Sequence, residues 1–389
     1  MAKKNNNVKK FSFFLNGKFD FPLLIITIFL LIFGLIMLLS ASTPTSISED
    51  GVSYKYVLRQ GEVVLFGLVL MIILSKIDYR IYKNFKWIIY IATVVLLIAV
   101  GLTGTSEGGA RRWIYILGFS FQPSEFAKIA FVIFFAALLS ELKEKNKIKK
   151  FVPGFCYPLI FLLPVVYAIF KLQNHFSATF IIGLVTLIQI FVAGASMKYF
   201  FLTGSAGIIG VLAYVLKKIA SPDGDGFRLG RIHTWLNIES DLTGAAWQIN
   251  QSLYAIGSGG LFGVGLGNSK QKYLYIPEPH NDFIFAVLAE EFGFLGCITV
   301  ITLFALFVWR GIVIAMKSQD TFGTLIAIGL TSIIGLQSLI NVAVVTNTIP
   351  VTGMPLPFFS YGGSAMLANL IGVGILLSVS RNSIKTNNN

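Results

Sequence analysis

Residues 22–39 read PLLIITIFLLIFGLIMLL, an apolar run without a charged side chain. A helix needs about 20 such residues to cross the hydrocarbon core of a bilayer. A basic stretch precedes the run, as in a secretory signal, but the run is too long for the apolar part of an ordinary signal peptide. The sequence therefore predicts an uncleaved first membrane span at residues 22–41.

Similar apolar blocks follow along the chain. Hydrophobic residues make up 55% of the 389 residues and charged residues 13%, whereas a soluble protein carries about 25% charged residues. We predict an all-α polytopic membrane protein with about ten transmembrane helices. The expected spans are 22–41, 58–75, 87–103, 123–140, 152–170, 177–194, 199–216, 283–309, 323–347 and 362–380.

The basic residues predict the orientation. Ten spans place all the basic clusters on one side of the membrane, which the positive-inside rule identifies as the cytoplasm. Both termini are then cytoplasmic, as tails 1–21 and 381–389 of a single transmembrane domain, 22–380. This clustering accounts for the net charge of +13 without a nucleic-acid partner. The clusters begin at Lys3, Arg80, Lys143, Arg310 and Arg381.

On the extracytoplasmic side, the loop at 217–282 between the seventh and eighth spans is far longer than the other connections. Loops of this length are usually functional or disordered, and this one contains aromatic residues and glycine runs. We expect ordered re-entrant or interfacial helices within it. The glycine-rich stretch 257–268 superficially matches a dinucleotide fingerprint, but no strand precedes it, so a tight turn is the better interpretation.

The two cysteines, Cys156 and Cys297, each fall inside an apolar block. They are more consistent with inert packed thiols than with a disulfide or a metal site. The cysteines and histidines also lack the spacing of a zinc site.

Ionisable residues beside apolar blocks mark candidate functional segments. At the start of the fourth span, Glu125 and Lys128 are i,i+3 neighbours, which fits either a structural ion pair or the polar wall of a substrate cavity. Just before that span, Arg111 and Arg112 stand beside Trp113 on the outer side. They could snorkel or bind an anionic group such as phosphate, and we favour anion binding.

The segment 277–282 has the sequence PEPHND and leads into an apolar block. Asp282 falls at the predicted helix N-cap, a position that Asp often occupies for capping alone. Glu290 and Glu291 follow within the same block, and three carboxylates are more than capping requires. The turn-rich run 350–364 is expected to wall the same site, because irregular backbone at membrane depth normally lines protein or a cavity.

These segments, in this order, resemble the SEDS (shape, elongation, division and sporulation) family of FtsW, RodA and SpoVE. The resemblance extends from Asp20 to Arg381, and the stretch 266–275 is closer to the division and sporulation branch of FtsW than to the rod-elongation branch. The motifs that carry it are GARRW (109–113), FQPSEFAK (121–128), FR and RI within 227–232, PEPHNDFIFA (277–286) and the run 350–364.

The resemblance implies a peptidoglycan glycosyltransferase that polymerises lipid II on the outer face of a bacterial plasma membrane, for cell division or cell shape. It also implies a class B penicillin-binding protein as the partner transpeptidase, within the divisome or the elongation machinery. The family's catalytic carboxylate falls on Asp282. Its substrate-binding positions fall on Arg111, Glu125, Lys128, Arg228, Arg231 and Ser360.

We hypothesise that Asp282 takes the proton from the 4-hydroxyl of the acceptor GlcNAc, whose oxygen attacks C1 of the donor MurNAc with inversion and expels undecaprenyl diphosphate. The arginines, with a divalent cation such as Mg²⁺ as the candidate cofactor, would neutralise the leaving charge. The competing function is a lipid II flippase or another transporter of lipid-linked precursors. The gathering of Asp282 and the arginines on one face favours the enzyme, and a passive scaffold would not explain these charges.

The sequence departs from the family pattern in two places. The sixth span usually begins after Gln-Pro and a short polar residue, whereas this chain has Gln173-Asn174-His175. These replacements leave the role of that turn open. Asn281 stands where Thr is commoner, a milder change that preserves hydrogen bonding.

Overall fold

The computed structural model describes residues 18–107, 110–116, 119–200, 235, 245–273 and 275–383. Within these residues, eight helical segments are long and apolar enough to cross a membrane. The elements in chain order are α1 (Phe21–Asp50), α2 (Lys55–Lys76), α3 (Ile81–Asn84), α4 (Lys86–Thr103), β1 (Thr105–Glu107), β2 (Ala110–Ile116), β3 (Phe119–Phe121), α5 (Pro123–Glu144), the π-helical turn η1 (Val152–Cys156), α6 (Tyr157–Tyr167), the π-helical turn η2 (Ala168–Leu172), α7 (Phe176–Ala193), α10 (Ala245–Gly259), α11 (Ile284–Lys317), α12 (Thr321–Val345) and α13 (Gly363–Ser383).

The predicted spans agree with these helices. Every predicted range except 199–216 coincides with a described helical segment, and residues 201–216 lie outside the described residues. The range 152–170 is irregular, because two π-helical turns flank α6 and Pro164 inside it cannot donate an i→i−4 hydrogen bond. Cys156 and Cys297 are free thiols, as expected.

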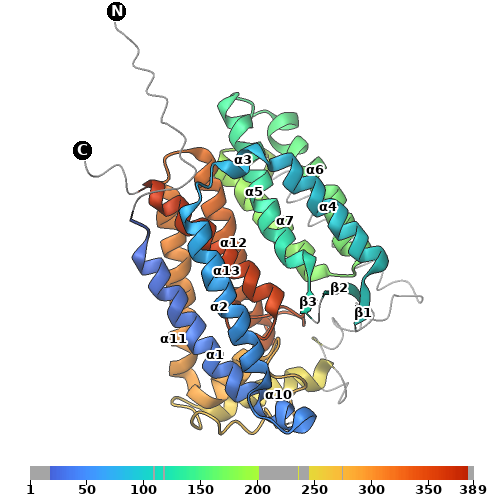
Figure 1. The fold of residues 1–389 in the computed structure, drawn as a ribbon, viewed down its shortest axis with the longest axis vertical. Helices are drawn as coiled ribbons and strands as arrows, with labels where there is room; N and C mark the ends of the chain where they lie inside the picture. The colour runs from blue at the N-terminus through green and yellow to red at the C-terminus, as the bar shows by residue number, and fades with distance from the viewer. Residues whose placement is uncertain are drawn as a thin grey trace, which may run out of the picture.

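The helices form two groups joined by α5. Figure 1 shows α1, α2, α11, α12 and α13 on one side of the molecule and α4, α6 and α7 on the other. α5 packs against α4, α7, α12 and α13, and most of its residues are buried. By contrast, α4 exposes Ile88, Ile91 and Val95. Apolar side chains on an outer helix face suit contact with lipid tails.

The long helix α11 is kinked at Gly293, where φ is 65° and ψ is −162°. A Cβ atom on Gly293 would lie 2.4 Å from the backbone nitrogen of Gly263, and one on Gly263 would lie 2.1 Å from the carbonyl oxygen of Glu291. The glycine-rich loop after α10 therefore lies with its backbone directly against the kink. This contact confirms the prediction of a tight turn, and α10 confirms that the long outer loop contains an ordered helix.

The connection at 104–122, between the predicted spans 87–103 and 123–140, contains a small antiparallel sheet in the order β1-β2-β3. Its register pairs Ser106 with Arg111 and Ile114 with Phe121. The strands follow from the aromatic and β-branched run at 113–116. They are too short to alter the all-α architecture.

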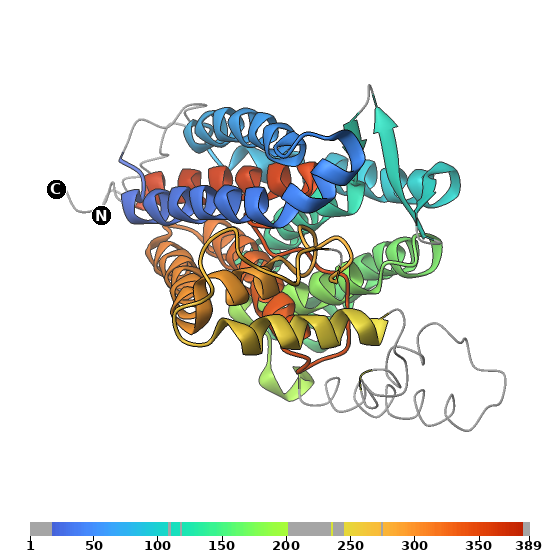
Figure 2. The same ribbon diagram turned by 90° about the horizontal axis from the view of Figure 1, so that it is seen from below.

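The described basic clusters, which begin at Arg80, Lys143, Arg310 and Arg381, lie towards the end of the bundle that carries α3, the upper end in Figure 1. There the start of α1 meets the end of α13, because the backbone nitrogen of Asp20 donates to Ser380 Oγ at 3.0 Å. Arg310 Nε donates to Asp20 Oδ1 at 3.2 Å, and Arg80 Nε pairs with Asp320 at 2.9 Å. The small sheet and α10, which packs against α11, lie at the other end (Figures 1 and 2).

Candidate active site

Asp282 lies in the turn immediately before α11, and its side chain is half-buried. Its Oδ2 atom is 3.5 Å from the place that a Cβ atom on Gly353 would occupy. Gly353 has a φ of 68°, which an L side chain rarely adopts. The loop between α12 and α13 thus brings an unsubstituted backbone against the carboxylate.

The prediction that Asp282 is the N-cap of the helix is wrong. The N-cap of α11 is Phe283, and no side-chain hydrogen bond caps it. The turn packs against the loop between α12 and α13, and α11 begins at Ile284, with Phe283 rather than Asp282 as its N-cap. Capping therefore does not explain an aspartate at this position.

The backbone around Asp282 is held at three successive carbonyl groups. The backbone nitrogen of Tyr361 donates to the carbonyl oxygen of His280 at 2.9 Å. Ser360 Oγ donates to the carbonyl oxygen of Asn281 at 2.7 Å, and Asn341 Nδ2 donates to that of Asp282 at 2.8 Å. The turn that carries the carboxylate is therefore fixed by α12 and by the loop that follows it.

Ser360, a predicted substrate-binding residue, is buried within this support. Its hydroxyl also accepts a hydrogen bond from the backbone nitrogen of Leu356 at 2.8 Å. Both contacts are internal to the protein, so the structure gives Ser360 a scaffolding position behind Asp282. Contact with substrate at this position stays a prediction.

The loop between α12 and α13 also joins Asp282 to the start of α5. Ser364 Oγ accepts a hydrogen bond from the backbone nitrogen of Gln122 at 2.9 Å and donates to the carbonyl oxygen of Ser120 at 3.1 Å. Ser177 Oγ, at the start of α7, donates to the carbonyl oxygen of Thr352. The segments that the sequence singled out around Glu125, at 277–282 and at 350–364 therefore meet at one end of the bundle.

Glu125 and Lys128 form the ion pair that their spacing predicts, with 2.8 Å between Lys128 Nζ and Glu125 Oε2. The pair is more deeply buried than a position near the outer rim suggests, since the two side chains are only 5% and 4% exposed. Lys128 lines a cavity of about 10 Å³ together with Thr186 and Gln189. Such a cavity holds about one water molecule. In this conformation the pair is thus enclosed by protein.

Of the three predicted substrate-binding arginines, the structure describes Arg111. Arg111 lies on β2, is exposed, and donates from Nη1 to the carbonyl oxygen of Leu102 at 3.0 Å. Arg228 and Arg231 lie outside the described residues. Arg111 lies at the end of the bundle that also carries Asp282.

The unusual turn at Asn174-His175 has a physical explanation. Asn174 has a φ of 50°, which Asn tolerates and which the proline ring excludes. Arg112, the neighbour of Arg111, holds this turn by donating to the carbonyl oxygens of Gln173 at 3.2 Å and Asn174 at 2.6 Å. His175 is buried, with Nδ1 3.4 Å from Ser124 Oγ. Its burial, together with Arg112 and Lys128, lowers the pKa of His175 well below its usual value.

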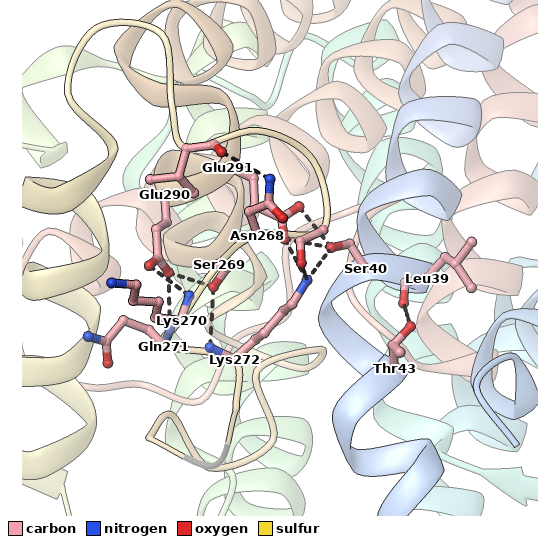
Figure 3. A network of polar contacts seen from close by, with 12 residues as sticks. Leu39, Ser40, Thr43, Asn268, Ser269, Lys270, Gln271, Lys272, Glu290 and Glu291 are labelled. Atoms are coloured by element: carbon pink, nitrogen blue, oxygen red, sulfur yellow. Dashed lines mark hydrogen bonds and ion pairs between the residues drawn. The ribbon is translucent and has the colours of Figure 1, made fainter. Parts of the chain in front are cut away.

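Glu290 and Glu291 form a separate polar network between α11, α1 and the glycine-rich loop (Figure 3). Glu290 accepts hydrogen bonds from Ser269 Oγ at 2.5 Å and from the backbone nitrogen of Lys270 at 2.9 Å. Glu291 pairs with Lys272 Nζ at 2.8 Å and accepts from Ser40 Oγ at 2.6 Å. These carboxylates pin the loop to α11, so they serve structure rather than the site around Asp282.

Sequence reasoning did not select two residues that the structure places at the site. Asn341 is an amide inside the apolar span of α12, and polar side chains in such spans often join helices. His280 lies inside the quoted PEPHND motif, and its ring is 4.5 Å from that of Tyr56 and 5.8 Å from that of Tyr361. The signal for Asn341 was a single polar residue in an apolar block, which gives no indication of its partners.

Known proteins resemble this chain over most of its length. A model of the cell cycle protein family FtsW/RodA/SpoVE matches residues 21–385. Stage V sporulation protein E of Bacillus subtilis (strain 168) is 41% identical over 366 residues, which cover 94% of this chain and 97% of that protein. A probable peptidoglycan glycosyltransferase FtsW of Geobacter sp. (strain M18) is 37% identical over 365 residues, which cover 93% of this chain and 96% of that protein.

Two solved structures share the fold. A chain of a peptidoglycan synthase complex, solved in work on the coordination of polymerization and crosslinking, has a TM-score of 0.78 and 25% identity, and the match covers 94% of this chain and 98% of that chain. The rod shape determining protein RodA of Thermus thermophilus has a TM-score of 0.67 and 26% identity, and the match covers 93% of this chain and 97% of that chain. The likeness therefore extends over nearly the whole length of each chain.

Proposed function

Because the chain belongs to the FtsW/RodA/SpoVE family of cell cycle proteins, we propose that it is a peptidoglycan glycosyltransferase. It polymerises lipid II into glycan strands on the outer face of the bacterial plasma membrane. The observation that carries this proposal is the half-buried carboxylate of Asp282, which does not cap its helix and whose backbone is fixed at three carbonyl groups.

In the proposed reaction Asp282 is the general base. Its carboxylate accepts the proton of the acceptor's GlcNAc 4-hydroxyl as that oxygen bonds to C1 of the donor's MurNAc. The bond from C1 to the diphosphate oxygen breaks, and its electron pair leaves with undecaprenyl diphosphate. Attack opposite the leaving group inverts C1. The leaving diphosphate is already anionic, so a second carboxylic acid is not required.

Arginine side chains are proposed to stabilise the charge on the diphosphate. Arg111 supports this role because its guanidinium is exposed on the outer end, and planar guanidinium groups bind phosphate oxygens through paired donors. Arg228 and Arg231 are included in the proposed diphosphate-binding group because the family resemblance places substrate-binding residues at these two positions. Glu125 and Lys128 contact substrate in this proposal only after the small cavity between α5, α7 and α12 widens.

A divalent cation such as Mg²⁺ is the proposed cofactor. The described residues contain no group of three or more His, Cys, Asp or Glu side chains that could hold a metal ion. Mg²⁺ does not need such a group, because it is usually bound by one or two carboxylates together with substrate phosphates and water. The bound cation would supply positive charge beside the diphosphate, on the side of C1 opposite to the acceptor hydroxyl that Asp282 serves.

The chain is a multi-pass membrane protein, and we propose that both termini are cytoplasmic. The basic residues of α3 and those at the ends of α11 and α13 share one end of the bundle, as the positive-inside rule expects of the cytoplasmic side. Asp282 and Arg111 then lie on the outer side, where the proposed reaction takes place.

The proposed partner is a class B penicillin-binding protein, the transpeptidase that crosslinks the new strand. Support comes from the structural neighbour that belongs to a peptidoglycan synthase complex. The relatives named stage V sporulation protein E and FtsW, at 41% and 37% identity, favour the division and sporulation branch over the RodA branch at 26%. The divisome is therefore the proposed setting, with the elongation machinery as the alternative.

The decisive experiment incubates the purified protein with lipid II, with and without the partner transpeptidase, and separates the products by gel electrophoresis. We expect ladders of glycan strands from the wild type and none from Asp282→Ala, with membrane insertion and thermal stability unchanged. A flippase would instead move lipid II across vesicles without forming strands. Ladders of wild-type intensity from Asp282→Ala would overturn the catalytic assignment.

A further inference from the structure

We propose that Asn341 is a positioning residue for the reaction: it fixes the backbone of Asp282 against the loop between α12 and α13, so that the carboxylate meets the acceptor hydroxyl in the correct geometry. The inference rests on the proposed function, because it assigns a role to Asn341 only through Asp282. It concerns the orientation of the base and not contact with substrate.

The amide of Asn341 uses its nitrogen to join two segments that are far apart in sequence. Asn341 lies on α12, its side chain is 1% exposed, and Nδ2 donates at 2.8 Å to the carbonyl oxygen of Asp282 and at 2.7 Å to that of Met354. An amide nitrogen carries two hydrogens. Both are therefore engaged, one on the turn before α11 and one on the loop after α12.

The same two segments meet a second time at the carboxylate. Gly353, the neighbour of Met354, is the residue whose Cβ would lie 3.5 Å from Asp282 Oδ2. By holding Met354, the amide also fixes the backbone that faces the carboxylate. Asn341 thus sets the position of the Asp282 backbone relative to the backbone of Gly353, beside which the Asp282 carboxylate lies.

The remaining atom of the amide shows that packing alone does not account for this residue. Asn341 Oδ1 is buried and has no hydrogen-bond partner among the described residues. A buried acceptor without a partner costs about 1–3 kcal/mol. A leucine of similar size would fill the space without this cost, so what Asn341 contributes is its pair of N–H donors.

The three contacts that hold this turn differ in how close their carbonyl group lies to the Asp282 side chain. Ser360 Oγ holds the carbonyl oxygen of Asn281, and the backbone nitrogen of Tyr361 holds that of His280. Of these three contacts, the one from Asn341 acts on the carbonyl group of Asp282 itself. Its loss is therefore expected to displace the carboxylate more than the loss of the Ser360 hydroxyl.

The test measures steady-state polymerisation of lipid II by the purified full-length chain with its partner transpeptidase, comparing Asn341→Leu with the wild type. We expect kcat to fall by about 10- to 100-fold, because a misplacement of about 1 Å can cost 10²-fold in rate. KM for lipid II should stay within about twofold, since the amide does not touch substrate. Gln337→Leu, a buried amide one turn earlier on α12, is the matched control and should keep the wild-type kcat.

The experiment also separates this inference from the proposed function. Polymerisation by Asp282→Ala would overturn the function of Asp282 itself, whereas an inactive Asp282→Ala with a wild-type kcat in Asn341→Leu would overturn only the positioning role. An equal loss of kcat in Asn341→Leu and Gln337→Leu would also overturn it. If Asn341→Leu fails to insert into the membrane, kcat and KM are measured for Asn341→Ser and Ser360→Ala instead. A wild-type kcat in both of these variants would refute the inference.

Discussion

The turn at Asp282 and the network at Glu290 and Glu291 lie close together in sequence, but the protein holds their carboxylates in different ways. In the network, the side chains themselves are engaged by Ser40, Ser269 and Lys272, and both carboxylates are fully buried. At Asp282, the hydrogen bonds from the α12–α13 region go to the backbone, and the side chain stays half-buried beside a glycine.

This difference separates a group that stabilises from a group that can react. A buried carboxylate whose oxygens are occupied by internal donors adds to the stability of the loop that provides them. A partly exposed carboxylate on a fixed backbone can accept a proton in a defined direction. The comparison predicts that substitutions in the two regions will affect different measurements.

The largest expected effect comes from matched amide substitutions in the two regions. Asp282→Asn keeps the size of the side chain but removes the base, so polymerisation should fall by roughly 10³-fold, within the range that general base catalysis contributes. The melting temperature should stay near that of the wild type. Polymerisation rates and thermal unfolding in detergent, measured on the same preparations, test both statements.

The matched variant Glu290→Gln should show the reverse behaviour. One amide oxygen cannot replace two carboxylate oxygens that accept from Ser269 and Lys270, so the melting temperature should fall. The rate per folded molecule should stay within about threefold, since the base is intact. A rate loss in Glu290→Gln as large as that in Asp282→Asn would abolish the distinction between the two regions.

The next largest effect is expected at the buried ion pair of Lys272 and Glu291. Glu291→Leu leaves the Lys272 ammonium group buried without its partner, which typically costs about 3–5 kcal/mol of folding stability. The double variant Lys272→Met/Glu291→Leu removes both charges and should recover most of that stability. Chemical or thermal unfolding of the three proteins provides the measurement, and a double variant less stable than Glu291→Leu would contradict the structural role.

Much of this architecture follows from the sequence because lipid solvation imposes simple rules. The length of an apolar block determines a span, as for residues 22–39 and α1, and the i,i+3 spacing of Glu125 and Lys128 determines their ion pair. Both are local properties of one helix. They do not depend on where the rest of the chain lies.

The features that the sequence did not predict depend on contacts between distant segments. Whether Asp282 caps α11 depends on where the α12–α13 loop holds the preceding turn, and the roles of Glu290 and Glu291 depend on Ser40 and Lys272. Asn341 is one amide in an apolar helix until its two carbonyl partners are known. The short sheet was missed because β1 and β3, the two strands that pair with β2, have only three residues each and carry little periodicity.

The smallest expected effect concerns pH and acts on the Asp282 region through His280. Burial lowers the pKa of His280 to about 4, with Glu49 opposing the shift, against about 6.5 in an unfolded chain. The folded protein therefore binds fewer protons than the unfolded chain between these values. Stability is complete above pH 6.5 and decreases as the pH falls towards 4, by about 2 kcal/mol at pH 5.

His280→Gln should flatten this pH dependence, because glutamine does not titrate. The pKa of His175 is also lowered by burial, so this residue also loses stability in acid. His175→Gln is therefore the comparison variant, and the double variant should be flatter than either. Since the carbonyl group of His280 is part of the support for Asp282, acid should lower the polymerisation rate of the wild type more than that of His280→Gln. Identical melting temperature profiles from pH 7 to pH 5 for the wild type and His280→Gln would show that His280 does not titrate in this environment.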